Sequence, residues 1–412
     1  MNQFSIYLAI AICLLSSAAH ARLDKFESKS TSSKIATSIQ GEHTNSNRPI
    51  NATITIQRLS SDDWIVHYQF SEPIDMLHFG PPVVKYRSDA WRVKTPGLHI
   101  KSNTEEEILF KPNGQFSEAI IAITSYHPFS HNQYVPMIHF SDQGVALFLG
   151  HLTGEVKAAG ETRPLAIRFE ASGRHGEKII LPKKAQENGN IFAYFGPQEP
   201  ISTSHGDLIL DPQTPVWMRE MMADTVKQVT ASYAESFGGA PAENVTIFLA
   251  LRDLHLNGYS LSGGALSGQI AYRLAGNQSI QNTPESRQRF IYLMAHELAH
   301  IWQFELNRLW KTSPESWIIE GGAEAISLTI LAKTGLWSTQ EVSKFKADLI
   351  KECGQSDNPI RIAYACGFKR FNDYGVDPLT LWGKLINESK KDGLPYSEAM
   401  IQKLLEEQSV LR

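Results

Sequence analysis

Residues 295–300 read Ala-His-Glu-Leu-Ala-His. On an α-helix, residues four positions apart lie one turn apart on the same face, so the imidazoles of His296 and His300 can reach one metal ion. Glu297 adjoins the first histidine, where its carboxylate can take a proton from a water molecule on the metal. The surrounding residues are apolar, which predicts a helix that runs through the core of a domain: Phe290, Ile291, Leu293, Met294, Leu298 and Ile301.

A second stretch, Trp-Ile-Ile-Glu-Gly-Gly-Ala-Glu at residues 317–324, supplies further carboxylates. A zinc site that catalyses hydrolysis has three protein ligands and one open position. Glu320 is the expected third ligand, after His296 and His300. Glu324 falls one helical turn later, where it can accept a hydrogen bond from the ring of a ligand histidine. The two stretches therefore predict a site for one zinc ion.

The two motifs resemble those of the gluzincin zinc metallopeptidases, a group that includes thermolysin, aminopeptidase N and leukotriene A4 hydrolase. The run at 317–324 is similar to the W-L-N-E-G-F-A sequence of the aminopeptidase branch. The interval 301–319 and the acid at Glu324 resemble thermolysin instead. The resemblance is specific over residues 240–370 and implies a thermolysin-like, mostly helical zinc peptidase domain.

Residues 263–273 read Gly-Gly-Ala-Leu-Ser-Gly-Gln-Ile-Ala-Tyr-Arg and are similar to the G-A-M-E-N strand of the aminopeptidases. In that family the strand lies beside the metal and pairs with the substrate main chain, which implies substrate-binding roles for Gly264 and Ala265. The family binds the free N-terminus of its substrate with the Glu of this strand, and residues 263–273 contain no Glu. An ordinary strand or hairpin with glycines is the alternative interpretation.

Residues 364–367 read Tyr-Ala-Cys-Gly and are similar to the Y-x-K-G pattern of the aminopeptidase-like enzymes, with Cys366 in place of the lysine. The resemblance implies that Tyr364 donates a hydrogen bond to the oxyanion of the tetrahedral intermediate. The alternative is a core tyrosine with no part in catalysis.

The first 21 residues contain no charged side chain, include an apolar run at 5–15 and end in Ala19-His20-Ala21, a small-x-small cleavage site. These features predict a secretory signal peptide at residues 1–21 and a secreted or periplasmic protein. Its removal would take Cys13 and leave Cys353 and Cys366, and an even pair in an exported protein favours a disulfide. If the chain is not exported, two unpaired thiols are expected.

The remaining sequence divides into a flexible segment at 22–48, an N-terminal β domain at 49–205 and a gluzincin-like catalytic domain at 206–412. The β domain is expected to be sandwich-like, because short alternating runs are separated by Gly, Pro, Asn and Asp. Residues 200–215 look turn-rich and mark the predicted junction. The fold class is thus α+β, an all-β domain followed by a mostly helical one.

Two details of the catalytic domain can be tested directly. The metal-binding helix should begin with Thr283 as N-cap and Pro284 as first residue, and it should extend to about Leu309. Gly321 and Gly322 lie inside a predicted helix, where each costs roughly 1 kcal/mol relative to Ala. Close packing against the metal-binding helix would explain them. Further amphipathic helices are expected at 338–350, 378–389 and 395–409.

The sequence predicts a zinc-dependent peptidase that acts on a peptide or protein substrate and is endopeptidase-like, because the amine-binding Glu is missing. The alternatives are an atypical aminopeptidase or a non-catalytic peptide-binding protein with a structural zinc, although Glu297 would have no use in the latter. A net charge of −4 does not indicate the excess of basic residues that binds nucleic acid. No later segment is apolar enough for stable membrane insertion. The oligomeric state is left open.

Overall fold

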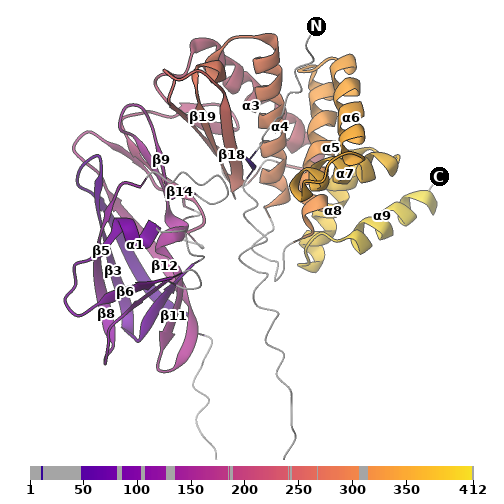
Figure 1. The fold of residues 1–412 in the computed structure, drawn as a ribbon. Helices are drawn as coiled ribbons and strands as arrows, with labels where there is room; N and C mark the ends of the chain where they lie inside the picture. Colours follow the sequence, from indigo (N-terminus) through magenta and orange to yellow (C-terminus); the bar gives the residue numbers. More distant parts are fainter. Residues whose placement is uncertain are drawn as a thin grey trace, which may run out of the picture. The chain divides into compact units, whose positions relative to one another are not determined.

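The fold of the chain is described from a computed structural model (Figure 1). It describes residues 11–12, 48–80, 86–103, 107–126, 135–183, 185, 189–239, 241, 244–266, 268–305 and 314–410. The described residues form two units. The β unit consists of residues 48–139 and 143–197, and the C-terminal unit consists of residues 198–410 with 11–12 and 140–142.

The β unit contains a nine-stranded sheet and a four-stranded sheet. Along the central strands, buried side chains alternate with side chains that face solvent, as expected for a sheet with one face on a core. The larger sheet has the order β5-β8-β3-β2-β12-β11-β4-β7-β6 and the smaller one β13-β14-β10-β9. The strands are β2 Ile50–Arg58, β3 Asp63–Ile74, β4 Met76–Phe79, β5 Trp91–Val93, β6 His99–Ser102, β7 Glu107–Phe110, β8 Phe116–Thr124, β9 Met137–His139, β10 Val145–Phe148, β11 Gly154–Ala158, β12 Glu161–Ser172, β13 Lys178–Ile180 and β14 Phe192–Gly196.

The C-terminal unit begins with a mixed sheet of order β1-β18-β19-β17-β16-β15. Its strands are β1 Ala11–Ile12, β15 Ile201–Ser202, β16 Gly206–Leu210, β17 Val245–Arg252, β18 Ser260–Leu266 and β19 Gln269–Ala275. The stretch 200–215 is therefore not a simple turn region, because its apolar residues Leu208, Ile209 and Leu210 form a buried strand. The stretch 263–273 belongs to an antiparallel hairpin of β18 and β19.

Within the described residues, seven longer helices follow or flank this sheet: α3 Val216–Phe237, α4 Pro284–Gln303, α5 Ser316–Thr334, α6 Thr339–Cys353, α7 Pro359–Asp373, α8 Pro378–Asp392 and α9 Glu398–Val410 (Figure 1). Thr283 caps α4 as predicted, with Pro284 in the first turn. The prediction that this helix extends to about Leu309 is wrong, since α4 ends at Gln303 and turn residues follow. Helix α7 was not predicted. None of the helices in the described ranges is long and apolar enough to cross a membrane.

Gly321 and Gly322 allow close packing of α5, but not against the metal-binding helix as predicted. A Cβ atom on Gly321 would lie 2.2 Å from the main-chain carbon of Gly367 in α7. A Cβ atom on Gly322 would lie 2.2 Å from the ring of Trp382 in α8. The two glycines therefore allow α7 and α8 to approach α5 at the turn that carries Glu320.

The architecture confirms the predicted α+β class, with a β unit followed by a unit whose C-terminal part is helical. The core of the C-terminal unit includes apolar side chains of the sheet and of α3, α4, α5, α7 and α8. Helices α4 and α5 pack against each other within this core. The two metal-binding stretches of the sequence are thus fixed on adjacent, buried helices.

Candidate metal centre

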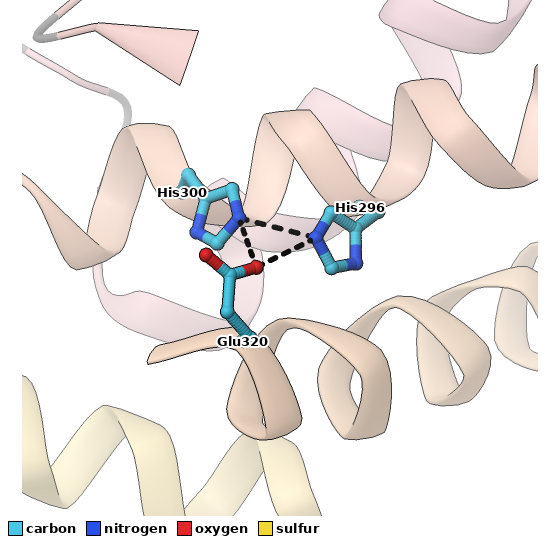
Figure 2. A group of neighbouring side chains, drawn as sticks. All are labelled: His296, His300 and Glu320. Atoms are coloured by element: carbon cyan, nitrogen blue, oxygen red, sulfur yellow. Dashed lines mark hydrogen bonds and ion pairs between the residues drawn. The ribbon is translucent and has the colours of Figure 1, made fainter. Parts of the chain in front are cut away.

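Three side chains from α4 and α5 direct their donor atoms at one point (Figure 2). The Nε2 atoms of His296 and His300 are 3.1 Å apart. The Oε2 atom of Glu320 lies 3.3 Å from the former and 3.4 Å from the latter. Within the described residues, they are the one group of His, Cys, Asp and Glu found in an arrangement able to hold a metal ion.

These distances match the edges of a zinc coordination tetrahedron. With bonds of about 2.0–2.1 Å, tetrahedral geometry places neighbouring ligand atoms about 3.3–3.4 Å apart. The Oε2 atom of Glu320 is buried and faces the two histidine nitrogens, so its charge requires a cation at this point, either a protonated histidine or a metal ion. Two imidazole nitrogens and one carboxylate oxygen are also ligands that zinc prefers. The residues present therefore suit one zinc ion.

The electrostatics of the site are those of a buried cluster of opposite charges. Burial lowers the pKa of His296, but interaction with Glu320 and the charges of Glu324 and Glu297 outweigh it and raise the pKa to about 9. Burial raises the pKa of Glu320, yet the two histidines overcome this effect and hold the pKa well below its ordinary value. The carboxylate thus remains ionised, as a metal ligand must be.

Glu324 lies on the far side of His296 from the donor cluster. Its Oε1 atom is 3.8 Å from Nδ1 of His296, too long for a hydrogen bond, and it accepts a short hydrogen bond from the hydroxyl of Tyr292. Burial raises the pKa of Glu324, while the charge of His296 and the bond from Tyr292 oppose the rise. The carboxylate is therefore placed to face the ring of His296, held by a tyrosine of the same helix α4.

Gln303, which the sequence analysis did not single out, contacts the second histidine. Its Oε1 atom is 2.6 Å from Nδ1 of His300, and its amide nitrogen donates to the main-chain carbonyl of Ile319, at 3.0 Å. The ring of His300 also stacks on Phe304, with centroids 5.2 Å apart. A glutamine at this position belongs to no motif, so only the folded arrangement identifies it.

Glu297 is completely buried beside the donor cluster, and neither of its carboxylate oxygens forms a hydrogen bond. Burial raises the pKa of Glu297, and the neighbouring His300 and His296 oppose the rise. The main chain of Ala265 in β18 also lies close enough to lower it. A buried carboxylate without a partner is a candidate for chemistry, because structure alone gives no reason to keep it there.

Tyr364 lies next to the donor cluster, although it is distant in sequence. Its ring stacks on that of His296, with centroids 5.4 Å apart and planes 17° apart. Burial raises the pKa of Tyr364 well above its ordinary value, and the charges of Glu320 and Glu297 raise it further. The phenol is therefore neutral and retains its proton for donation.

Cys353 and Cys366 form the predicted disulfide, which joins the last residue of α6 to the middle of α7. Tyr364 lies two residues before Cys366 on α7. Gly367 follows and contacts Gly321, the neighbour of Glu320. The disulfide thus anchors the segment of α7 that lies beside the metal ligands.

The strand that contains Gly264 and Ala265 is β18, which pairs with β19 along one edge. Its other edge pairs with β1 at Ser262 and Gly263, and leaves Gly264 and Ala265 beyond this pairing. Helix α4 packs against β18. The structure therefore brings the predicted substrate-binding strand to the helix that carries Glu297.

The sequence matches no protein-family model and no curated protein. Among solved structures, it is similar to an aminopeptidase N family protein from Idiomarina loihiensis, with a TM-score of 0.59 and 12% identity over 85% of this chain and 72% of that chain. For a mutant M1 zinc metallopeptidase from Deinococcus radiodurans, the TM-score is 0.47 and the identity 13%, over 88% of this chain and 90% of that chain. For yeast LTA4 hydrolase, the TM-score is 0.46 and the identity 9%, over 87% of this chain and 64% of that chain.

At 12% identity, the likeness to the aminopeptidase N family protein concerns the fold. It agrees with the order of elements described above, a β unit followed by a sheet and helices with both metal-binding stretches in the latter. The chain therefore has a fold similar to that of the aminopeptidase N family protein.

Proposed function

We propose that the protein is a zinc-dependent peptidase of the gluzincin type. The observation that carries the proposal is the convergence of three donor atoms at the spacing of a zinc tetrahedron, with a buried and unpartnered carboxylate beside them. In this proposal His296, His300 and Glu320 hold one zinc ion and Glu297 is the general base. A purely structural site would have no use for a free carboxylate at this position.

Bound zinc would polarise the peptide carbonyl and bring the pKa of a water molecule towards neutrality. Glu297 accepts the proton of the attacking water and passes it to the leaving amine. Its burial supports this role, because a raised pKa brings a carboxylate closer to the pKa that proton transfer near neutral pH requires. Tyr364 donates its phenolic proton in a hydrogen bond to the developing oxyanion.

The main chain of β18 would align the substrate as an additional strand, with Gly264 and Ala265 beside the scissile bond. This edge of β18 pairs with Ala11–Ile12 at Ser262 and Gly263, and removal of the proposed signal peptide would leave it free for a substrate strand. The described part of residues 263–273 contains no carboxylate. We therefore favour an endopeptidase, with an atypical aminopeptidase as the alternative.

The proposed site of action is outside the cytoplasm, in the periplasm or in the medium. The features that support it are the apolar N-terminal run with its Ala19-His20-Ala21 sequence and the disulfide between Cys353 and Cys366. N-terminal sequencing of the exported protein tests it. The expected mature terminus is Arg22, and a cytoplasmic protein that retains Met1 would contradict it.

The test of the function is the Glu297→Gln variant. Glutamine is nearly isosteric but cannot accept a proton, so the variant should bind zinc as the wild type does and lose hydrolysis of a quenched fluorescent peptide library. Metal analysis of the same samples reports the zinc content. Near-wild-type hydrolysis by the variant would refute the role of Glu297, and a wild type that binds no zinc would refute the site.

A further inference from the structure

The second ligand histidine is held by an amide, although a carboxylate, a main-chain carbonyl or a water is the usual partner of a ligand histidine. Gln303 is the last residue of α4 and is completely buried. Its side chain lies between the ring of His300 and the main chain of α5 at Ile319, the residue before Glu320. One side chain therefore contacts both helices that supply zinc ligands in the proposed function.

The orientation of this amide is determined by its partner on α5. The carbonyl of Ile319 can only accept a hydrogen bond, so the amide NH2 group of Gln303 must face it, at 3.0 Å. The amide oxygen then faces Nδ1 of His300, at 2.6 Å. A flipped amide would place two acceptors together at Ile319 and lose the bond to α5.

The amide orientation in turn decides the tautomer of His300. The oxygen of Gln303 only accepts, so Nδ1 of His300 carries the proton and donates it. In the neutral ring, the lone pair is then on Nε2, the atom that faces His296 and Glu320. A metal ligand must present this lone pair. The hydrogen bond from Gln303 to Ile319 of α5 fixes the tautomer that does so.

We propose that Gln303 is a positioning residue that sets the Nδ1–H tautomer of His300 and ties it to the helix that carries Glu320. The inference rests on the proposed zinc site and adds to it a residue outside the ligand set. Phe304 covers one face of the imidazole and keeps the ring in place. The main-chain carbonyl of Gln303 separately accepts a hydrogen bond from the hydroxyl of Tyr396, at 3.2 Å, a contact that does not involve the side-chain amide.

Two substitutions separate the tautomer effect from packing. Gln303→Met keeps the length of the side chain but removes the acceptor and the donor, so zinc affinity measured by chelator competition should fall about 10- to 100-fold, the usual cost of losing such a contact. Gln303→Glu restores an acceptor for Nδ1–H and lacks the donor for Ile319. It should recover a large part of the zinc affinity lost in Gln303→Met.

The matched control is Tyr396→Phe, which removes a contact with the main chain of Gln303 and leaves its side-chain amide in place. Its zinc affinity should equal that of the wild type. Equal zinc affinity in Gln303→Met and the wild type would overturn the inference. Equal losses in Gln303→Met and Gln303→Glu, or a loss in Tyr396→Phe as large as in Gln303→Met, would also overturn it, because packing would then be the cause.

Nitrogen-15 NMR of the histidines in the zinc-free wild type provides a measurement that needs no folded variant. The proposal predicts a proton on Nδ1 of His300, and an Nε2–H tautomer would contradict it. If the wild type binds no zinc at all, the proposed function fails. If it binds zinc and only the comparison of variants is negative, the role of Gln303 fails and the zinc site stands.

Discussion

At the scale of single residues, the side chains of the site differ in whether they have partners. The donor atoms of His296, His300 and Glu320 face one another, while the carboxylate of Glu297 has no hydrogen-bond partner. A buried carboxylate without a partner costs stability, and the three donor atoms are directed at one position that a shared cation could occupy. Their concentration in one place is the physical basis of the proposal that a cation and a polar substrate complete the site.

Tyr364→Phe tests the proposed donor of a hydrogen bond to the oxyanion. The phenylalanine retains the ring that stacks on His296 and loses only the hydroxyl. Turnover should fall by about 10²–10³-fold, as in other losses of an oxyanion donor, while zinc affinity and the free energy of unfolding change little. Steady-state kinetics and denaturant unfolding measure the two effects. An unchanged turnover number would make Tyr364 an ordinary core residue.

At the scale of secondary-structure elements, helix α7 connects several parts of the site. It carries Tyr364, is joined to α6 by the disulfide and contacts α5 at Gly321. The position of α7 relative to α5 therefore determines how Tyr364 faces the ligands.

The disulfide should stabilise the unit and position Tyr364. Cys353 and Cys366 are 13 positions apart, and closing a loop of this size contributes roughly 3 kcal/mol in the chain-entropy model. The Cys353→Ser/Cys366→Ser variant should lose free energy of unfolding of this order and some turnover, because α7 is then less firmly held. Denaturant unfolding and kinetics on the oxidised wild type and the variant measure both. An equal free energy of unfolding for the two proteins would show that the disulfide does not stabilise the unit.

Gly321→Ala should separate α5 from α7. Its Cβ atom would meet the main chain of Gly367, which cannot move aside as a side chain can, and overpacking of this kind costs about 1–3 kcal/mol. Because Glu320 is the adjacent residue, zinc affinity should fall as well. Thermal unfolding with and without zinc measures both effects.

The matched control for this prediction is Gly383→Ala in α8. A Cβ atom there would lie 3.5 Å from its nearest neighbour, an ordinary contact. Alanine should be tolerated or should stabilise the helix by up to about 1 kcal/mol. If Gly321→Ala were as stable as Gly383→Ala, the close contact of α5 and α7 would have no energetic importance.

The sequence could predict features that depend on local periodicity and could not predict those that depend on packing. The spacing of His296 and His300 is local to one helix, so their common face followed from the sequence. Gln303 has no such pattern, and its role depends on a carbonyl of another helix. The predicted packing partner of Gly321 and Gly322 was wrong because it also depends on tertiary packing. A glycine indicates that another element approaches closely but does not identify that element.

At the scale of the whole molecule, the fold and the substrate-binding strand bear differently on which substrates the chain can accept. The likeness to the aminopeptidase N family protein extends over 85% of the chain and concerns the fold, which does not decide the substrate. The sequence of the β18–β19 hairpin argues against an aminopeptidase, because residues 263–273 contain no Glu for a substrate amino group. Function depends on the site and not on the fold.

Peptides with a blocked N-terminus should therefore be cut at least as well as the same peptides with a free N-terminus. The physical reason is that a free ammonium group gains affinity only where a carboxylate is placed to pair with it. Mass spectrometry of the products from acetylated and free peptide pairs measures the preference and locates the cut. A strict requirement for a free amino group would support the aminopeptidase alternative.

The proposed function depends on one zinc ion that binds between α4 and α5. Its most direct test is X-ray diffraction from crystals of the zinc-loaded protein on both sides of the zinc absorption edge. We expect one anomalous peak at about 2.0–2.2 Å from Nε2 of His296, Nε2 of His300 and a carboxylate oxygen of Glu320. A peak elsewhere, or no peak at this position, would contradict it.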